Sequence, residues 1–224
     1  MTAVERIVVV GAGAIGGWIA GKLALAGEPV SVLARGGTLE ALRSSGLHLT
    51  EGDATRDVEV HASDDPVELG PQDVLVIAVK APALAEAAEA ARPMIGAETL
   101  IVPMLNGVPW WFTGEPLPSV DPGGRIAAAL PQAQIIGSVV HAACSRPAPN
   151  EVVVKHADRL ILGQQRRRRT GDLVHQIDGF ADASSEGEAM ATPRPVRRAQ
   201  AGTCSAVPDI QRGACFPDRN RHPQ

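Results

Sequence analysis

The stretch Val8-Val9-Val10-Gly11-Ala12-Gly13-Ala14-Ile15-Gly16 joins an apolar, β-branched run to a Gly-x-Gly-x-x-Gly sequence. A segment with helical periodicity follows at once, so the order is strand, tight turn and helix, as at the start of a dinucleotide-binding unit. Gly11 permits the turn, Gly13 lets the backbone approach a pyrophosphate, and Gly16 lets the helix pack closely on the strand. The stretch therefore predicts a dinucleotide site. The alternative is a glycine-rich turn that binds no ligand.

The residue after the second predicted strand indicates which dinucleotide is favoured. Residues 29–34 form that strand, and Arg35 follows it. An Asp or Glu at its end would accept a hydrogen bond from the ribose 2′-OH of NAD, but the next carboxylate is Glu40. A guanidinium group at this point pairs well with a 2′-phosphate. The sequence thus favours NADP(H), and the alternative for Arg35 is a solvated loop charge.

Two polar residues follow two further predicted strands. Residues 74–79 and 99–104 are continuous apolar runs, typical of buried parallel strands. Lys80 follows the first run and Asn106 the second. Because ligands of open α/β sheets bind at the carboxyl ends of the strands, both residues are candidates for binding substrate or cofactor. The alternatives are a solvated lysine and an asparagine that caps a turn.

The alternation of strands and helices predicts an α/β fold of the Rossmann type, doubly wound around a mostly parallel sheet. We expect Thr38 to be the N-cap of a helix that ends at residue 45. Later in the chain, residues 47–50 and 58–62 are expected as edge strands, and residues 134–143 as a further strand. Residues 151–155 and 159–162 are expected as a hairpin, with its turn at residues 156–158.

The amino-acid composition excludes several classes of protein. The net charge of −4 over 224 residues gives no reason to expect nucleic-acid binding. Three cysteines are too few for a disulfide scaffold and favour a reducing compartment. The apolar run at residues 7–21 is short and glycine-rich, so it predicts neither a membrane span nor a signal peptide. We therefore expect a cytoplasmic protein without a membrane partner.

The composition changes sharply near Gly163. Residues 164–224 hold 10 Lys and Arg against 7 Asp and Glu, and only 9 of these 61 residues are Leu, Ile, Val, Met, Phe or Trp. Such a segment has little apolar area to offset its ordering entropy. We expect a dinucleotide-binding domain at residues 1–163 and a poorly ordered tail at residues 164–224. The four arginines at 166–169 are expected to be a solvated charge run, and no metal site is predicted.

Several motifs together resemble a known family. Gly11–Gly16, Arg35, Val79-Lys80-Ala81, Asn106-Gly107-Val108-Pro109 and the segment 137–143 occur in the order found in the N-terminal domain of ketopantoate reductase (2-dehydropantoate 2-reductase). The resemblance covers residues 5–163. It implies NADPH-dependent reduction of a small 2-keto acid, 2-dehydropantoate, to pantoate on the route to pantothenate.

The resemblance also implies roles for individual residues. Gly11, Ala12, Gly13, Ala14, Ile15 and Gly16 would hold the pyrophosphate, and Arg35 the 2′-phosphate. Lys80 would face the ribose and substrate, Asn106 would bond near the nicotinamide and substrate, and Ala143 would contact the cofactor through its backbone. His141 matches the family pattern and is expected to be a buried structural histidine. Cys144 is given no role.

The sequence departs from the family after Gly163. The family supplies a lysine as general acid from a helical C-terminal domain, but the lysines here are Lys22, Lys80 and Lys155. No catalytic residue is assigned, and a truncated chain with weak or no activity is expected. We hypothesise that the tail is an out-of-frame extension, which translation of the other downstream frames tests. The alternatives are a non-catalytic NADP-binding module and a non-functional gene fragment.

Overall fold

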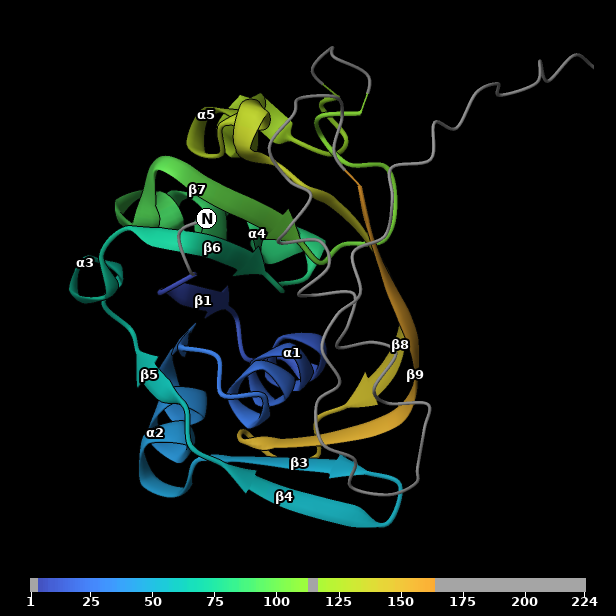
Figure 1. Cartoon of the computed structure of the whole chain (residues 1–224). Coiled ribbons are helices and arrows are strands. Elements are labelled where there is room, and N and C mark those ends of the chain that lie inside the picture. Colours follow the sequence, from blue (N-terminus) through green and yellow to red (C-terminus); the bar gives the residue numbers. More distant parts are fainter. Residues whose placement is uncertain (1–3, 113–116, 164–224) are drawn as a thin grey trace, which may run out of the picture. The chain divides into compact units, whose positions relative to one another are not determined.

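The computed structural model describes residues 4–112 and 117–163, which all belong to one compact unit. Its centre is a five-stranded sheet in the order β5-β2-β1-β6-β7, in which every neighbouring pair is parallel (Figure 1). The strands are β1 (Ile7–Val10), β2 (Val30–Leu33), β5 (His61–Ser63), β6 (Gln72–Ile77) and β7 (Ile95–Pro103). The predicted Rossmann-type, mostly parallel α/β fold is confirmed.

Helices cover both faces of this sheet. They are α1 (Ala14–Leu25), α2 (Gly36–Ser45), α3 (Pro66–Leu69), α4 (Leu84–Ala91) and α5 (Arg125–Ala129), with short 3-10 turns at Ala81–Ala83, Arg92–Met94, Pro122–Gly124 and Gln132–Gln134. Buried alanines of α4 and Ile126 of α5 pack on one face, against Val8 and Val10 of β1. Because β1 is buried on both faces, its four residues are all apolar and β-branched.

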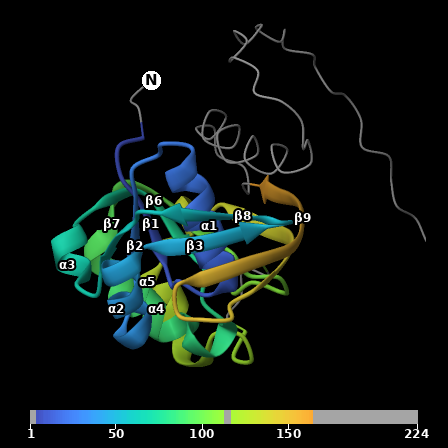
Figure 2. The same ribbon diagram turned by 90° about the horizontal axis from the view of Figure 1, so that it is seen from below.

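A second sheet lies on the far side of α1 from the parallel sheet (Figure 1). It has the order β4-β3-β9-β8 and consists of β3 (Leu47–Glu51), β4 (Ala54–Val58), β8 (Gly137–Ser145) and β9 (Glu151–Gly163). Figure 2 shows β3 beside β9, with which it pairs in parallel. A Cβ on Gly17 would stand only 2.6 Å from Cγ2 of Val152, so α1 approaches this sheet closely.

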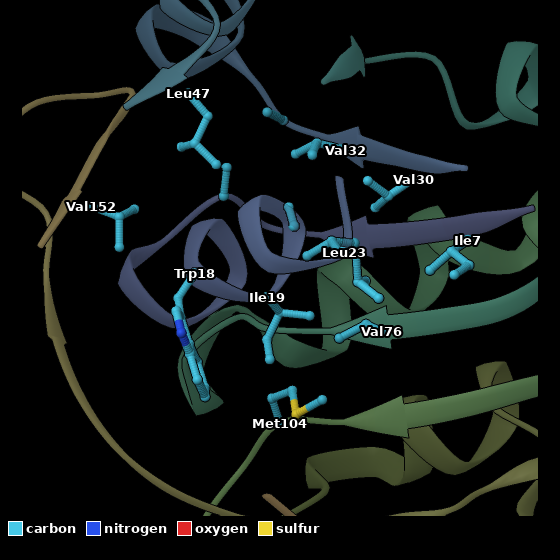
Figure 3. Packing of buried hydrophobic residues seen from close by; sticks show 14 of the residues in the cluster. Ile7, Trp18, Ile19, Leu23, Val30, Val32, Leu47, Val76, Met104 and Val152 are labelled. Carbon is cyan, nitrogen blue, oxygen red and sulfur yellow. The ribbon is translucent and has the colours of Figure 1, made fainter. Parts of the chain in front are cut away.

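The layer between the two sheets is a continuous apolar core around α1. In Figure 3, Leu47 and Val152 of the second sheet lie on one side of the helix, and Val76 of the parallel sheet lies on another. Trp18 of α1 is only 3% exposed within this cluster. Burying one large apolar side chain stabilises a fold by about 1.5–3 kcal/mol, so this layer holds the two sheets and the helix together.

The structure corrects three local predictions. The return strand after Glu51 begins at Ala54, not at residue 58, and His61–Ser63 joins the parallel sheet instead. The predicted turn at residues 156–158 is wrong, because β9 continues through it with irregular pairing to β8. Thr38 is not an N-cap, because α2 begins at Gly36 and Arg35 occupies the capping position.

The predicted tail at residues 164–224 lies outside the described residues, and so does the proposed domain boundary beyond Gly163. Within residues 4–112 and 117–163, no helix has both the length and the apolar character needed to cross a membrane.

Candidate functional site: a cleft at the carboxyl ends of β1 and β2

The backbone turn after β1 requires glycine at two of its three fingerprint positions. Gly11 has a φ of +93°, a conformation that side-chain-bearing residues rarely adopt. A Cβ on Gly16 would lie 1.9 Å from the carbonyl oxygen of Gly11, so α1 can start here only with glycine at that position. The fold itself thus accounts for Gly11 and Gly16.

Gly13 has no such structural requirement. Its φ of −74° and ψ of −169° are open to any L-residue. A Cβ there would meet only the carbonyl oxygen of Ala78, at 3.9 Å. Gly13 is also the N-cap of α1, where the first backbone N–H groups have no partner within the helix. A bare backbone beside free N–H groups fits an anion such as a pyrophosphate, because the N–H groups donate hydrogen bonds and the helix dipole favours negative charge.

A cleft of about 290 Å³ opens over this turn. Gly11, Ala12 and Gly13 line it from the turn, and Ala34 and Arg35 line it from the end of β2. Its remaining walls come from more distant segments: Thr38 of α2, Val79 after β6, Ala83, Glu86, Ala87 and Ala90 around α4, and Arg146 after β8. The structure therefore brings the predicted turn and Arg35 together at one site.

Arg35 faces a carboxylate across the cleft. Its Nη1 forms an ion pair with Oε1 of Glu86, which lies in the first turn of α4. The side chains of Arg35 and Glu86 are 60% and 67% exposed, so solvent screens the pair and its contribution to stability is small. The guanidinium is available to an incoming anion that competes with Glu86.

Arg146 is a second cation of the cleft, and sequence reasoning missed it. Its Nη1 donates a hydrogen bond to Oγ1 of Thr38 at 2.9 Å, with longer contacts to the carbonyl oxygens of Pro149 at 3.4 Å and Ala12 at 3.5 Å. The side chain thereby links the loop after β8 to the glycine turn and to α2. The sequence showed only an arginine after a strand, followed by turn residues, and nothing local pointed to this cleft.

Lys80 and Asn106 follow β6 and β7 as predicted, but neither lines the cleft. Lys80 is exposed and precedes the 3-10 turn Ala81–Ala83. The Asn106 amide donates to the carbonyl oxygen of Val140 at 3.0 Å and accepts from the Val140 N–H at 3.0 Å. Asn106 thus ties the end of β7 to β8 and keeps one N–H and one lone pair for another partner. Its predicted role at substrate stays a prediction.

The residues of β8 differ in part from expectation. Ala143 is exposed and pairs with His156 of β9, and its predicted backbone contact with a cofactor stays a prediction. His141 is exposed, so the expectation of a buried structural histidine is wrong: its neighbour Val140 takes the inward position of this strand. Burial, with a smaller effect from Glu51, raises the pKa of the Cys144 thiol to about 11. A thiol of this kind is a poor nucleophile at neutral pH.

Comparison with known proteins identifies the family. The family model described as ketopantoate reductase PanE/ApbA matches residues 7–167. The chain belongs to this family. It is 40% identical over 174 residues to a 2-dehydropantoate 2-reductase of Mesorhizobium japonicum, a match that covers 74% of this chain and 53% of that protein.

Solved structures of ketopantoate reductases share the fold. A protein of Ralstonia solanacearum MolK2, described as a candidate ketopantoate reductase, is 44% identical with a TM-score of 0.75, over 80% of this chain and 59% of that one. The 2-dehydropantoate 2-reductase of Geobacter metallireducens GS-15 is 28% identical with a TM-score of 0.66, over 80% and 55% of the two chains. This member of the ketopantoate reductase family thus spans between half and three fifths of the length of these relatives.

Within the described part of this ketopantoate reductase domain, no group of three or more His, Cys, Asp or Glu side chains could hold a metal ion. The polar groups of the cleft are backbone N–H donors, two guanidinium groups, one hydroxyl and one carboxylate. Such a set suits the binding of phosphate groups and a ribose rather than a nucleophilic attack.

Proposed function

We propose that residues 1–163 form a cofactor domain that binds NADP(H) in the cleft over the glycine turn. The observation that carries this proposal is Gly13, whose missing side chain leaves space that the fold does not fill. Gly11, Ala12, Gly13, Ala14, Ile15 and Gly16 would hold the pyrophosphate through their backbone at the start of α1. Arg35 would pair with the 2′-phosphate, and Arg146 would hold the turn from the opposite wall.

The choice of NADP(H) over NAD(H) rests on the end of β2. This strand ends at Leu33, followed by Ala34 and Arg35, so no carboxylate of the strand accepts a hydrogen bond from a ribose 2′-OH. Arg35 and Arg146 both line the cleft. Arg146 already donates hydrogen bonds within the protein, so the Arg35 guanidinium is the group that favours the cofactor with the additional phosphate.

We further propose that the domain serves the reduction of a small 2-keto acid, with 2-dehydropantoate as the substrate. The names of the matched relatives and the motifs around Lys80 and Asn106 support this substrate class. NADPH supplies the hydride when bound. Negative charge then develops on the substrate carbonyl oxygen, and the exposed Lys80 ammonium and the free N–H of Asn106 are groups that stabilise such charge.

We propose that catalysis by this chain is weak. A ketone accepts hydride efficiently only when a proton donor meets the developing alkoxide. Lys22 is paired with Glu51 at 3.1 Å, and Lys155 lies on β9. The sequence after Gly163 contains no lysine, so Lys80 is left to act without the second lysine that the resemblance implies. We place this function in the cytoplasm, as the small number of cysteines suggests.

The test is a titration of the full chain with NADPH, followed by fluorescence, together with a turnover assay on 2-dehydropantoate. We expect saturable binding of NADPH and turnover well below that of a full-length reductase. Lys80→Gln should lower the remaining turnover, whereas Lys155→Gln, a matched change on β9, should not. Absence of NADPH binding by a chain that melts cooperatively refutes the proposed cofactor site. Turnover equal to that of a full-length reductase refutes the proposed weakness.

The same assays separate the other candidates. Binding without any detectable turnover favours a non-catalytic NADP-binding module, for which the intact cleft is the supporting feature. Failure to melt cooperatively favours a non-functional fragment. Exposed apolar side chains such as Phe112 and the cross-strand pair Val139 and Ile161 make aggregation the expected sign of that outcome.

A further inference from the structure

Glu86 is an acidic residue at the very end of the cleft that is expected to bind a phosphate. It lies in the first turn of α4, fifty-one positions from Arg35 in the sequence, and its carboxylate pairs with the Arg35 guanidinium. Among the described residues that line the cleft, it is the only carboxylate. The group is not needed to satisfy a buried cation, since Arg35 is mostly exposed.

We propose that Glu86 is a specificity-determining residue that reduces the preference of this chain for NADPH over NADH. This inference rests on the proposed cofactor site. A 2′-phosphate and the Glu86 carboxylate both carry negative charge, so they compete for the Arg35 guanidinium and repel each other. The ribose of NADH presents a hydroxyl donor instead, and a carboxylate that already faces this end of the cleft is a good acceptor for it. Glu86 thus opposes one cofactor and favours the other.

Arg146, the second guanidinium of the cleft, does not cancel the opposition of Glu86 to NADPH. The Nη1 of Arg146 already donates to Thr38, with longer contacts to the carbonyl oxygens of Ala12 and Pro149. The Arg146 guanidinium is therefore fixed by the protein, whereas the Arg35 guanidinium pairs with Glu86 alone among the residues that the structure describes. A carboxylate that enters from α4 gives the ribose an acceptor that the end of β2 lacks.

Glu86→Gln tests the proposal, because glutamine keeps the size of the side chain and removes its charge. We expect the Kd for NADPH to fall about fivefold, equivalent to about 1 kcal/mol. We expect the Kd for NADH to rise about twofold, since a carboxylate acceptor becomes a neutral one. The ratio of the two constants should therefore move about tenfold toward NADPH. Both are measured by calorimetric titration of the full chain.

Glu89→Gln is the matched control. Glu89 lies in the same helix, does not line the cleft, and pairs with Arg125 of α5 at 2.7 and 2.8 Å. It should leave the ratio of the two Kd values unchanged within about twofold. The effect of Glu86→Gln should also shrink in about 1 M salt, where the screening length falls to about 3 Å. A change that is undiminished in high salt, or that Glu89→Gln reproduces, overturns the proposal.

The cofactor site and the role of Glu86 are tested by different outcomes. If the native chain binds neither cofactor, the proposed cofactor site is wrong, and this inference is overturned with it. If the native chain binds NADPH but Glu86→Gln leaves the ratio of the two Kd values unchanged, only the role of Glu86 is overturned. An equal fall in the Kd for both cofactors also contradicts the role of Glu86, because the competition for Arg35 involves the 2′-phosphate alone.

Discussion

Replacing Gly13 with alanine should weaken cofactor binding while leaving the free energy of unfolding nearly unchanged. The backbone dihedrals at Gly13 are open to alanine, and a Cβ would meet only the Ala78 carbonyl oxygen at 3.9 Å. We therefore expect the free energy of unfolding to change by less than about 1 kcal/mol, the size of an N-cap effect. Binding should suffer far more, because a methyl group would occupy the space through which a phosphate reaches the backbone N–H groups.

The expected loss of affinity follows from the hydrogen bonds to that phosphate. Losing one charge-assisted hydrogen bond costs about 1.5–3 kcal/mol. At about 1.4 kcal/mol for each factor of ten, Gly13→Ala should raise the Kd for NADPH by about 10- to 150-fold. The same factor should apply to NADH, because both cofactors carry the pyrophosphate.

Gly16→Ala is the control within the same motif. Its Cβ would lie 1.9 Å from the Gly11 carbonyl oxygen, so the start of α1 must shift. Overpacking of this kind costs about 1–3 kcal/mol or more. Thermal unfolding and NADPH titration of both variants measure the two effects, on stability and on affinity. A Gly13→Ala variant that binds NADPH like the native chain, or that unfolds as readily as Gly16→Ala, would refute the cofactor cradle.

Two further variants test the site, and one reagent tests the surroundings of Cys144. Arg35→Ala should weaken NADPH binding by about tenfold or more while changing NADH binding by less than about threefold. Calorimetry with both cofactors measures this. An equal loss of affinity for both contradicts the pairing of Arg35 with the 2′-phosphate. Arg146→Met removes the hydrogen bonds to Thr38 and Ala12 but keeps an unbranched side chain. It should raise the Kd for both cofactors about equally, by about three- to tenfold. A loss of affinity confined to NADPH would place Arg146 on the 2′-phosphate instead. The pKa of the Cys144 thiol is about 11, above its ordinary value of 9.0. At pH 8, iodoacetamide should therefore alkylate Cys144 about a hundredfold more slowly than a free cysteine, and the rate should increase as the pH rises. Peptide mass spectrometry measures the rate, and rapid labelling at pH 8 rules out the raised pKa.

Sequence alone could predict the parts of the site that are local in the chain. Gly11, Gly13, Gly16 and Arg35 belong to one strand–helix–strand unit, whose geometry is fixed by short-range rules. β1 and the second halves of β6 and β7 could also be predicted, because buried parallel strands are continuous apolar runs. Their predicted bounds differ by a few residues, since strand ends depend on pairing rather than on composition.

Glu86 and Arg146 could not be predicted, because tertiary packing alone brings them to the cleft. Glu86 arrives through the placement of α4, and Arg146 through the loop between β8 and β9. The second sheet was missed for a related reason. Residues 151–154 of β9 pair with β3, but among the described strands the later residues of β9 pair with β8 alone, and many are exposed. Polar residues are tolerated there, so His156-Ala157-Asp158 has the composition of a turn within a strand.

The contact between α1 and β9 also has a consequence for the order of folding. His48 of β3 pairs with Glu151 of β9, about a hundred residues later in the chain, and non-local parallel pairing of this kind is slow to form. When a ribosome has made the first 130 residues, the glycine turn, all five parallel strands and Leu47 of β3 have been synthesised, but Val152 of β9, which lies closest to Gly17, has not. Arg146 is also still to come. The last residue to line the cleft is thus Arg146, in the loop between β8 and β9, and cofactor capture by a nascent chain would report the synthesis of that loop.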